Sequence, residues 1–148
     1  MPKERYRNIA AAYLVLVKDS KVFLQRRCNT GYEDGNYGMP AGHVEEKESF
    51  TGCVIREIKE EIGIDLKSED LKVVHVMHRY GGEKNERVDV FFTAEKYGGE
   101  ITNMEPHKCD ELSWHDLDNL PENIIPYIKK AIENVKNKVF YSEFGWQK

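Results

Sequence analysis

The chain has 148 residues, of which 40% are hydrophobic and 32% are charged, and its formal net charge is −4. A chain of this length can bury a hydrophobic core without disulfides or a structural metal, so we expect a single domain over residues 1–148. The negative charge argues against a protein that holds nucleic acid chiefly through phosphate contacts, and we expect no stable nucleic-acid partner.

The N-terminal part of the sequence predicts a β-hairpin followed by a long loop. The apolar run 9–17 and the extended pattern 22–26 indicate two strands, and turn-forming residues at 19–20 separate them. Residues 29–38 contain three glycines together with Asn and Asp, which is the composition of a loop. A loop of that length in a compact domain is often functional.

The C-terminal part predicts a second hairpin, a short strand and a helix. Residues 71–80 and 88–97 read as two strands joined by a glycine turn. An irregular acidic stretch then leads to a short strand near Trp114 and to a helix at about 122–137, where isoleucines recur at helical spacing. The segment 141–146 is rich in aromatic residues, and we expect it to pack against the domain.

The middle of the chain carries a spaced motif. Residues 42–64 read GHVEEKESFTGCVIREIKEEIGI and match G-x5-E-x7-R-E-U-x-E-E-x-G-U, where U is a bulky aliphatic residue, at every specified position. The single-residue matches alone would coincide by chance on the order of once in 10⁸ positions. In this motif the sequence resembles the Nudix hydrolase family. The matching residues are Gly42, Glu48, Arg56, Glu57, Ile58, Glu60, Glu61, Gly63 and Ile64.

The residues of the motif also predict a metal site on their own chemistry. Residues 49–62 have helical periodicity, with Ser49 as N-cap. Glu61 falls within the apolar stripe of this helix, and Glu57 and Glu60 share its flank. Three ionised carboxylates this close raise each other's pKa unless cations intervene. Oxygen ligands favour a hard ion, so we expect Mg²⁺, with Mn²⁺ as a substitute.

The resemblance implies a role for each residue of the motif. It implies metal ligands from the helix and from the loop before it: Glu57, Glu60, Glu61 and a main-chain carbonyl of Ala41 or Gly42. Glu48 and Arg56 stand where the family places residues that orient the metal-binding acids and hold the loop on the helix. Without the motif, the same residues would indicate a solvent-exposed acidic helix face and an ordinary surface ion pair between Glu48 and Arg56.

Candidates for the general base and for substrate binding lie outside the motif. In the family the base is an acid of the motif or one from a later loop, here within residues 105–111. We favour Glu111, and Glu105 and the motif glutamates remain alternatives. Arg26 and Arg27 end the second predicted strand and are candidates for gripping phosphate, although such pairs are also typical of a solvated edge. Tyr37 is a candidate for stacking on a base.

The resemblance also implies the fold class and the reaction. The class is α/β: an α/β/α sandwich with a mixed β-sheet, the motif helix on one face and the C-terminal helix on the other. The activity is a magnesium-dependent hydrolysis of the pyrophosphate bond in a nucleoside diphosphate linked to another moiety, such as a nucleoside triphosphate or a nucleotide sugar. Two alternatives stay open, a nucleotide sensor with weak or no hydrolysis and a pyrophosphohydrolase of RNA 5′ ends. Neither the leaving group nor the formation of a homodimer can be read from the sequence.

The cysteines and the hydropathy indicate the compartment. Cys28, Cys53 and Cys109 are odd in number and far apart, without zinc spacing or a disulfide framework. The N-terminus lacks the apolar core of a signal peptide, and no run approaches about 18 apolar residues. We therefore expect reduced thiols and a soluble, cytoplasmic protein without a membrane partner.

Overall fold

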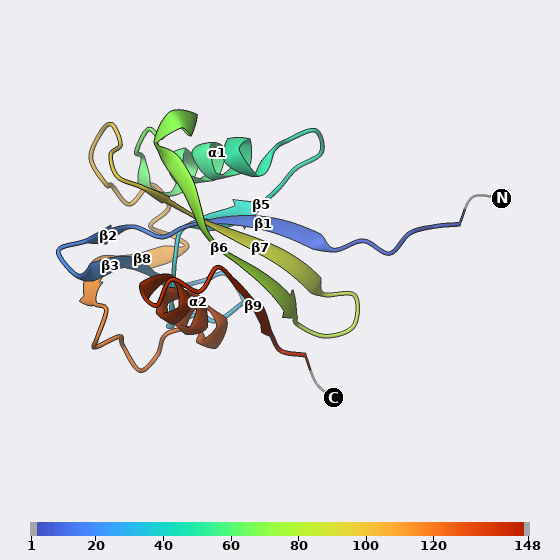
Figure 1. The fold of residues 1–148 in the computed structure, drawn as a ribbon. Coiled ribbons are helices and arrows are strands. Elements are labelled where there is room, and N and C mark those ends of the chain that lie inside the picture. The colour runs from blue at the N-terminus through green and yellow to red at the C-terminus, as the bar shows by residue number, and fades with distance from the viewer. Residues whose placement is uncertain (1–2, 147–148) are drawn as a thin grey trace.

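The computed structural model describes residues 3–146 (Figure 1). The elements follow in chain order: β1 (Ile9–Leu14), β2 (Val17–Lys18), β3 (Lys21–Arg27), β4 (Tyr37–Gly38), β5 (Ala41–His43), α1 (Phe50–Ile62), the 3₁₀ turn η1 (Ser68–Asp70), β6 (Leu71–Tyr80), β7 (Glu86–Ala94), β8 (Cys109–Asp116), α2 (Pro126–Lys136) and β9 (Tyr141–Phe144).

The strands form two sheets. The first has five strands in the order β5-β1-β7-β6-β9. It is mixed, because β1 pairs with β7 and β6 with β9 in parallel, whereas β1–β5 and β6–β7 are antiparallel. The second sheet is antiparallel and joins β2, β3 and β4, with β8 also paired to β3. The predicted mixed sheet is therefore confirmed.

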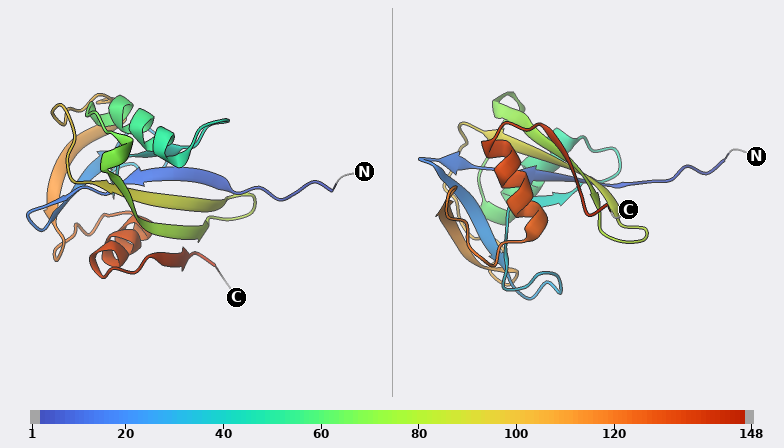
Figure 2. Two further views of the ribbon diagram at one scale, coloured as in Figure 1. Left: turned by 45° about the horizontal axis from the view of Figure 1, so that its top comes forward. Right: turned by 60° about the horizontal axis from the view of Figure 1, so that its bottom comes forward.

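The two helices cover opposite faces of the five-stranded sheet (Figures 1 and 2). The reason is visible in β1 and the two residues after it, because alternate side chains of a strand point to opposite faces. Ala11, Tyr13 and Val15 pack in the core with α2. Ala12, Leu14 and Leu16 pack in the core with α1. The predicted α/β/α sandwich is confirmed.

Local signals in the sequence define both ends of α1. The Ser49 side chain accepts a hydrogen bond from the Gly52 backbone N–H at 3.0 Å, which caps the first turn. Gly63 ends the helix with φ of 75°, a left-handed conformation that costs glycine little. The buried residues of the helix form the predicted apolar stripe: Cys53, Val54, Ile58 and Ile62.

The first predicted hairpin differs from the structure. The apolar run 9–17 is not one strand but two, since β1 belongs to the five-stranded sheet and β2 to the second sheet. The chain changes sheets at Val15 and Leu16, where the Val15 N–H bonds to Phe92 and the Leu16 carbonyl accepts from Phe23. Both residues are buried, so the hydrophobic pattern runs on without a break and hides the switch.

The predicted start of the last helix was also wrong. The helix α2 begins at Pro126 rather than near residue 122. Ile124 and Ile125 are buried next to Tyr37, and the backbone of Tyr37 bonds to residues on both sides of Ile124. They continue the helical spacing of the isoleucines although they lie in an extended segment, and proline then fixes the first helical turn.

The remaining elements differ from prediction mainly in length. The strand near Trp114 is an eight-residue strand, β8, and β7 starts and ends earlier than the predicted 88–97. The aromatic tail packs as expected: β9 pairs with β6, and the Trp146 indole N–H donates to the His78 carbonyl at 2.9 Å. All three cysteines are free. In the described part of the chain, no helix has the length and apolar character needed to cross a membrane.

Candidate functional site

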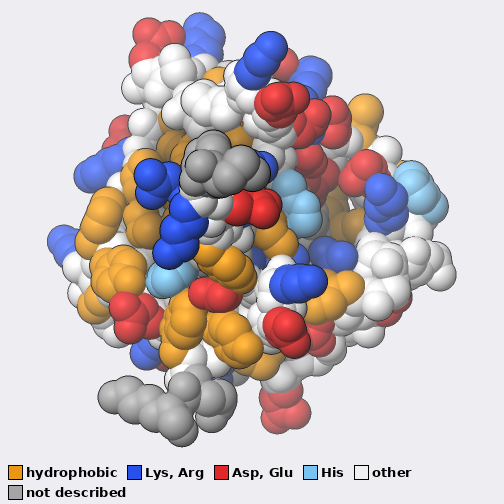
Figure 3. Space-filling view, turned by 90° about the vertical axis from the view of Figure 1, so that its right-hand side faces the viewer, with side chains coloured by type: hydrophobic (Ala, Val, Ile, Leu, Met, Phe, Trp, Pro, Cys, Tyr) orange, Lys and Arg blue, Asp and Glu red, His pale blue; other side chains and the backbone are white. Residues whose placement is uncertain are grey.

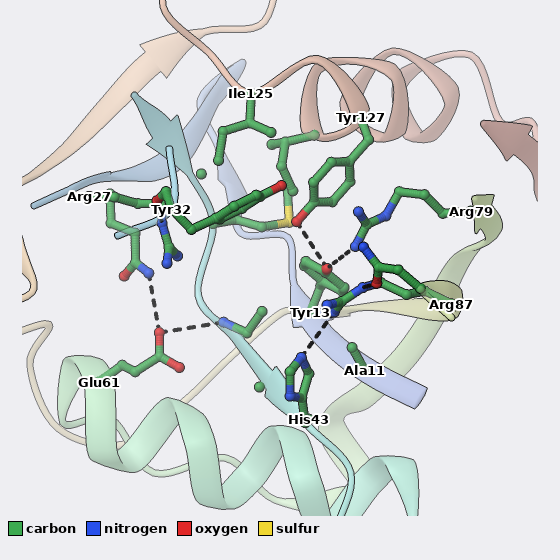
Figure 4. A pocket seen from close by; sticks show the side chains of 17 residues that line it. Ala11, Tyr13, Arg27, Tyr32, His43, Glu61, Arg79, Arg87, Ile125 and Tyr127 are labelled. Atoms are coloured by element: carbon green, nitrogen blue, oxygen red, sulfur yellow. Dashed lines mark hydrogen bonds between the residues drawn. The ribbon is translucent and has the colours of Figure 1, made fainter. Parts of the chain in front are cut away.

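Two adjoining cavities lie where β3, β5 and α1 meet. The acidic cavity has a volume of about 330 Å³, and Glu57, Glu60, Glu61 and Glu105 are among its lining residues. The arginine cavity, of about 340 Å³, lies between the five-stranded sheet and the first turn of α2, and is lined by Arg27, Arg79 and Arg87 among others (Figure 4). Both cavities share four lining residues, so they form one continuous cleft: Gln25, Arg27, Ala41 and Glu61.

Glu61 stands at the junction of the two cavities. Its Oε1 accepts hydrogen bonds from Gln25 Nε2 at 3.2 Å and from the Ala41 backbone N–H at 3.4 Å. Burial raises the pKa of this carboxyl from 4.5 to about 8, and the nearby charge of Glu57 adds to the increase. The carboxyl therefore points into the buried side of α1, as the helical pattern predicts, and it is largely protonated at neutral pH when no cation is bound.

Arg56 organises the other acids of the motif. Its Nε and Nη2 bind the two oxygens of Glu48 at 2.7 and 2.9 Å, and its Nη1 contacts Glu57 at 2.7 Å and Glu60 at 3.7 Å. Nη2 also donates to the His43 carbonyl at 3.2 Å. The hydrogen bond from Arg56 lowers the pKa of Glu48 to about 2. Arg56 thus ties the loop to the helix and fixes Glu57, as the resemblance implies for this position.

Gly42 allows β5 to lie directly against α1. A Cβ atom at this position would collide with the Glu57 carboxyl group. The Gly42 carbonyl accepts a hydrogen bond from Cys53 Sγ at 3.4 Å, which anchors the strand to the helix. The main chain at Ala41 and Gly42 therefore runs beside two of the acids, Glu57 and Glu61.

The acids fit a hard divalent cation by donor chemistry, because all of them present oxygen to one cavity. Their carboxylate oxygens do not meet at one point. Over residues 3–146, no three His, Cys, Asp or Glu side chains are grouped as the ligands of a metal ion would be. The reason lies in their partners. Arg56 holds Glu57, Gln25 and the Ala41 N–H hold Glu61, and Glu60 is 55% exposed. These donors satisfy the carboxylates that would otherwise repel one another.

The segment 105–111 contributes Glu105 rather than Glu111 to the acidic cavity. Glu111 lies on β8 and accepts hydrogen bonds from the Tyr37 hydroxyl at 2.6 Å and from Ser113 Oγ at 2.9 Å. The bond from Tyr37 lowers the pKa of Glu111. Glu105 is close enough for its charge to raise the pKa of Glu61. The geometry therefore favours Glu105 over Glu111 as the acid from the later loop.

Of the three expected substrate-binding residues, the structure brings only Arg27 into the cleft. Arg27 lines both cavities, and its Nε donates to the Tyr32 carbonyl at 2.8 Å. Arg26 points to the opposite side of β3, where it pairs with Asp110 at 2.7 Å. Tyr37 is buried, with its hydroxyl on Glu111 instead of in the cleft.

The sequence interpretation missed the residues that form the arginine cavity. Arg79 on β6 pairs with Asp89 on β7 at 2.7 Å, and both side chains are buried. The guanidinium of Arg79 lies 3.7 Å from the ring centroid of Tyr127. Arg87 and Tyr13 complete the group (Figure 4). These residues come from four elements, so no local spacing connects them. The available signal was two charged residues, Arg79 and Asp89, within segments that the sequence predicts to be strands.

The fold and the cleft define a class: an α/β/α sandwich protein that carries a carboxylate cluster on a helix beside a nucleotide-sized cavity. The model of the NUDIX domain family matches residues 6–135. The NAD-capped RNA hydrolase NudC of Stutzerimonas stutzeri is 30% identical over 118 residues, 80% of this chain and 40% of that protein. The ADP-ribose pyrophosphatase of Methanocaldococcus jannaschii is 32% identical over 111 residues, 73% of this chain and 62% of that protein. The chain thus spans less than two thirds of either relative.

Solved structures agree with this assignment. The MutT Nudix hydrolase from Burkholderia pseudomallei superposes with a TM-score of 0.77 at 27% identity, covering 86% of this chain and 97% of that one. The MutT protein from Methanosarcina mazei Go1 reaches 0.76 at 19% identity, covering 92% and 98%, which is a likeness of fold. The chain belongs to the Nudix family.

Proposed function

We propose that this protein is a magnesium-dependent hydrolase that cleaves the pyrophosphate bond of a nucleoside diphosphate linked to another moiety. The observation that carries the proposal is that the three motif acids Glu57, Glu60 and Glu61 line one cavity, which is continuous with a second cavity of nucleotide size. The relatives' names support it, since NAD-capped RNA and ADP-ribose both contain a nucleoside joined through pyrophosphate. We propose that residues 1–148 act as one domain, in the cytoplasm.

In this proposal the acids of α1 hold the cation. The ligands are Glu57, Glu60, Glu61 and a main-chain carbonyl of Ala41 or Gly42. Bound Mg²⁺, or Mn²⁺ in its place, would neutralise the phosphates and lower the pKa of a coordinated water. Glu48 and Arg56 are positioning residues, because they act by fixing Glu57 and the loop.

Arg27 and Glu105 complete the proposed machinery. Arg27 lines both cavities, and in this proposal its guanidinium grips the pyrophosphate. Glu105 accepts the proton of the water that attacks phosphorus. The new P–O bond forms as the bridging P–O bond breaks, and the leaving phosphate takes the electron pair. A motif glutamate is the competing choice for the base.

The first test of the proposal is metal dependence with a panel of nucleotides. We expect phosphate or nucleoside monophosphate release from at least one nucleoside triphosphate, nucleotide sugar or dinucleotide with Mg²⁺ or Mn²⁺, and loss of release in EDTA. Calcium should not restore the same rate, because it prefers more ligands and a looser geometry. Full activity of metal-free enzyme would disprove the metal assignment.

The panel also separates the two alternatives. A sensor would bind one of the nucleotides, detected by calorimetry, without releasing product. A pyrophosphohydrolase of RNA 5′ ends would prefer a capped or triphosphorylated oligonucleotide to the free nucleotide. The charge of −4 and the mononucleotide size of the cleft favour the small substrate.

A further inference from the structure

The end of the cleft away from α1 is cationic, although the proposed hydrolysis does not use this charge. Arg79 and Arg87 line the arginine cavity and not the acidic cavity, and Figure 4 shows them across the cavity from Glu61. Neither Arg27 nor Arg87 forms an ion pair with a carboxylate of the described chain. A positive cavity is thus built into a protein whose net charge is negative.

Arg79 is held rigidly and keeps donors free. Its side chain is 8% exposed, its Nε donates to Asp89, and its Nη2 donates to the Tyr13 hydroxyl at 3.4 Å. The Tyr127 ring packs against the guanidinium plane. No acceptor for Nη1 is found among residues 3–146. A buried guanidinium with an unused N–H edge that lines a cavity is suited to an anionic ligand.

The hydrogen-bond partners of Arg87 are an amide and an imidazole rather than a carboxylate. Its Nε donates to Asn85 Oδ1 at 2.7 Å and its Nη1 to His43 Nε2 at 3.0 Å. Arg87 therefore brings a positive charge to the cavity wall without a direct ion pair to a carboxylate of residues 3–146.

The first turn of α2 adds a third source of positive potential. Ile125, Tyr127 and Ile128 line the same cavity, and the N-cap Ile125 has no side-chain acceptor for the first backbone N–H groups. Uncapped N–H groups and the helix dipole favour an anion near this end of a helix.

We propose that this end of the cleft binds a second phosphate, a phosphomonoester carried by the part of the substrate farthest from the scissile pyrophosphate. Arg79 on β6 and Arg87 on β7 line this end of the cleft, and α2 begins beside it. Guanidinium donors and the N-terminus of a helix both favour a phosphate group. The inference rests on the proposed function in one respect, because it assigns the pyrophosphate to the neighbouring acidic cavity.

The first experiment measures binding without catalysis. Inorganic phosphate is titrated into the protein in EDTA, and its dissociation constant is measured by NMR shifts. We expect Arg87→Gln to weaken binding by about tenfold or more, since charge-assisted hydrogen bonds to phosphate are lost. Arg5→Gln removes the same charge from the exposed N-terminal segment and serves as the control. Arg79→Gln is avoided, because it would leave Asp89 buried without its partner.

The second experiment tests the position of the phosphate on substrates. Values of kcat/KM are compared for NADP⁺ against NAD⁺, and for coenzyme A against its dephosphorylated form, with Mg²⁺. We expect the phosphorylated member of at least one pair to be preferred by about tenfold, and Arg87→Gln to reduce the ratio of the two kcat/KM values to about one.

The results distinguish the two proposals. Phosphate binding that depends on Arg87 supports the second phosphate site even if no nucleotide is cleaved, an outcome that would overturn the proposed function instead. Hydrolysis of both members of each pair at equal rates, with phosphate binding unaffected by Arg87→Gln, would overturn the phosphate site and leave the hydrolase intact. Circular dichroism of Arg87→Gln and Arg5→Gln confirms that both variants are folded.

Discussion

Glu61 is an acid placed where a neutral side chain would be more stable. Its position on the apolar stripe of α1 was predictable, because helical spacing fixes which face a residue occupies. Its hydrogen-bond donors were not predictable, since Gln25 and Ala41 reach it from β3 and β5. Burial raises the pKa of Glu61 to about 8, and the hydrogen bonds from Gln25 and Ala41 act in the opposite direction.

The shifted pKa of Glu61 predicts how metal-free stability depends on pH. The folded value, about 8, lies above the ordinary 4.5, so the stabilising contribution is complete below the lower value and is lost as pH rises through the upper one. We expect Tm in EDTA to fall between about pH 5 and pH 9 more steeply than in Glu61→Gln. Magnesium, which needs the ionised form, should raise Tm more at the alkaline end. Parallel Tm curves for both proteins would refute this assignment.

The carboxylates of α1 predict a loss of turnover without a loss of fold. Glu60→Gln or Glu61→Gln should lower kcat by at least about a hundredfold, because each removes a negative charge that helps to hold an activating ion. Steady-state rates and circular dichroism on the purified variants provide the measurement. Near-normal turnover in both variants would exclude these acids as ligands.

Glu105 and Glu111 form a matched pair for identifying the general base. Glu105→Gln should slow turnover by about 10² to 10⁴, the usual range for a lost base, and remove the acidic limb of the pH–rate profile. Glu111→Gln should retain most activity, since Glu111 contacts Tyr37 and Ser113 outside the acidic cavity. The reverse result would restore Glu111 as the base. Normal rates in both variants would leave that role to the motif.

Among the elements, α1 was the most completely predictable and α2 the least. The N-cap of α1, the glycine that ends the helix and its apolar stripe are local features, and all of them lie within fifteen residues of sequence. The start of α2 depends on Ile124 and Ile125 packing beside Tyr37, a contact across more than eighty residues. The change of sheets after β1 was hidden for a similar reason, because both cores accept apolar side chains.

The close approach of β5 to α1 predicts the effect of one added methyl group. Gly42→Ala should displace the Glu57 carboxyl, with which the new Cβ would collide, and so lower kcat or raise the magnesium requirement. Gly52→Ala is the control, because its Cβ would meet only the Ser49 and Glu48 side chains at 3.3 and 3.6 Å. Magnesium titrations of activity compare the variants. Unchanged magnesium dependence in Gly42→Ala would show that Glu57 does not need its present position.

At the scale of the whole molecule, the net charge of −4 describes the chain only as a sum. On the face shown in Figure 3, basic and acidic side chains alternate instead of forming one basic field. The composition gives the net charge directly. It does not predict the arginine cavity, because the residues of this cavity come from β1, β6, β7 and α2 and meet only in the folded chain. Composition therefore predicts the electrostatic potential far from the protein, and the fold determines the potential inside the cleft.

The net negative charge predicts weak competition by RNA. An unphosphorylated oligoribonucleotide should inhibit hydrolysis of a nucleotide substrate only weakly, and the inhibition should depend little on salt, since few phosphate contacts are available. The measurement is the inhibition constant at two salt concentrations. Inhibition that is tight in low salt and lost in high salt would reveal a basic RNA path and favour the capped-RNA alternative.

The strand β1 contributes side chains to both hydrophobic cores, and this affects how the protein folds during synthesis. Residues 9–14 are synthesised well before their parallel partner, residues 87–92, and one of the two cores that they enter is closed by α2. A nascent chain that ends before α2 therefore exposes one apolar face of its first strand. We expect the native fold to form only after α2 has been synthesised, with β1 dependent on chaperones or on transient local contacts until then.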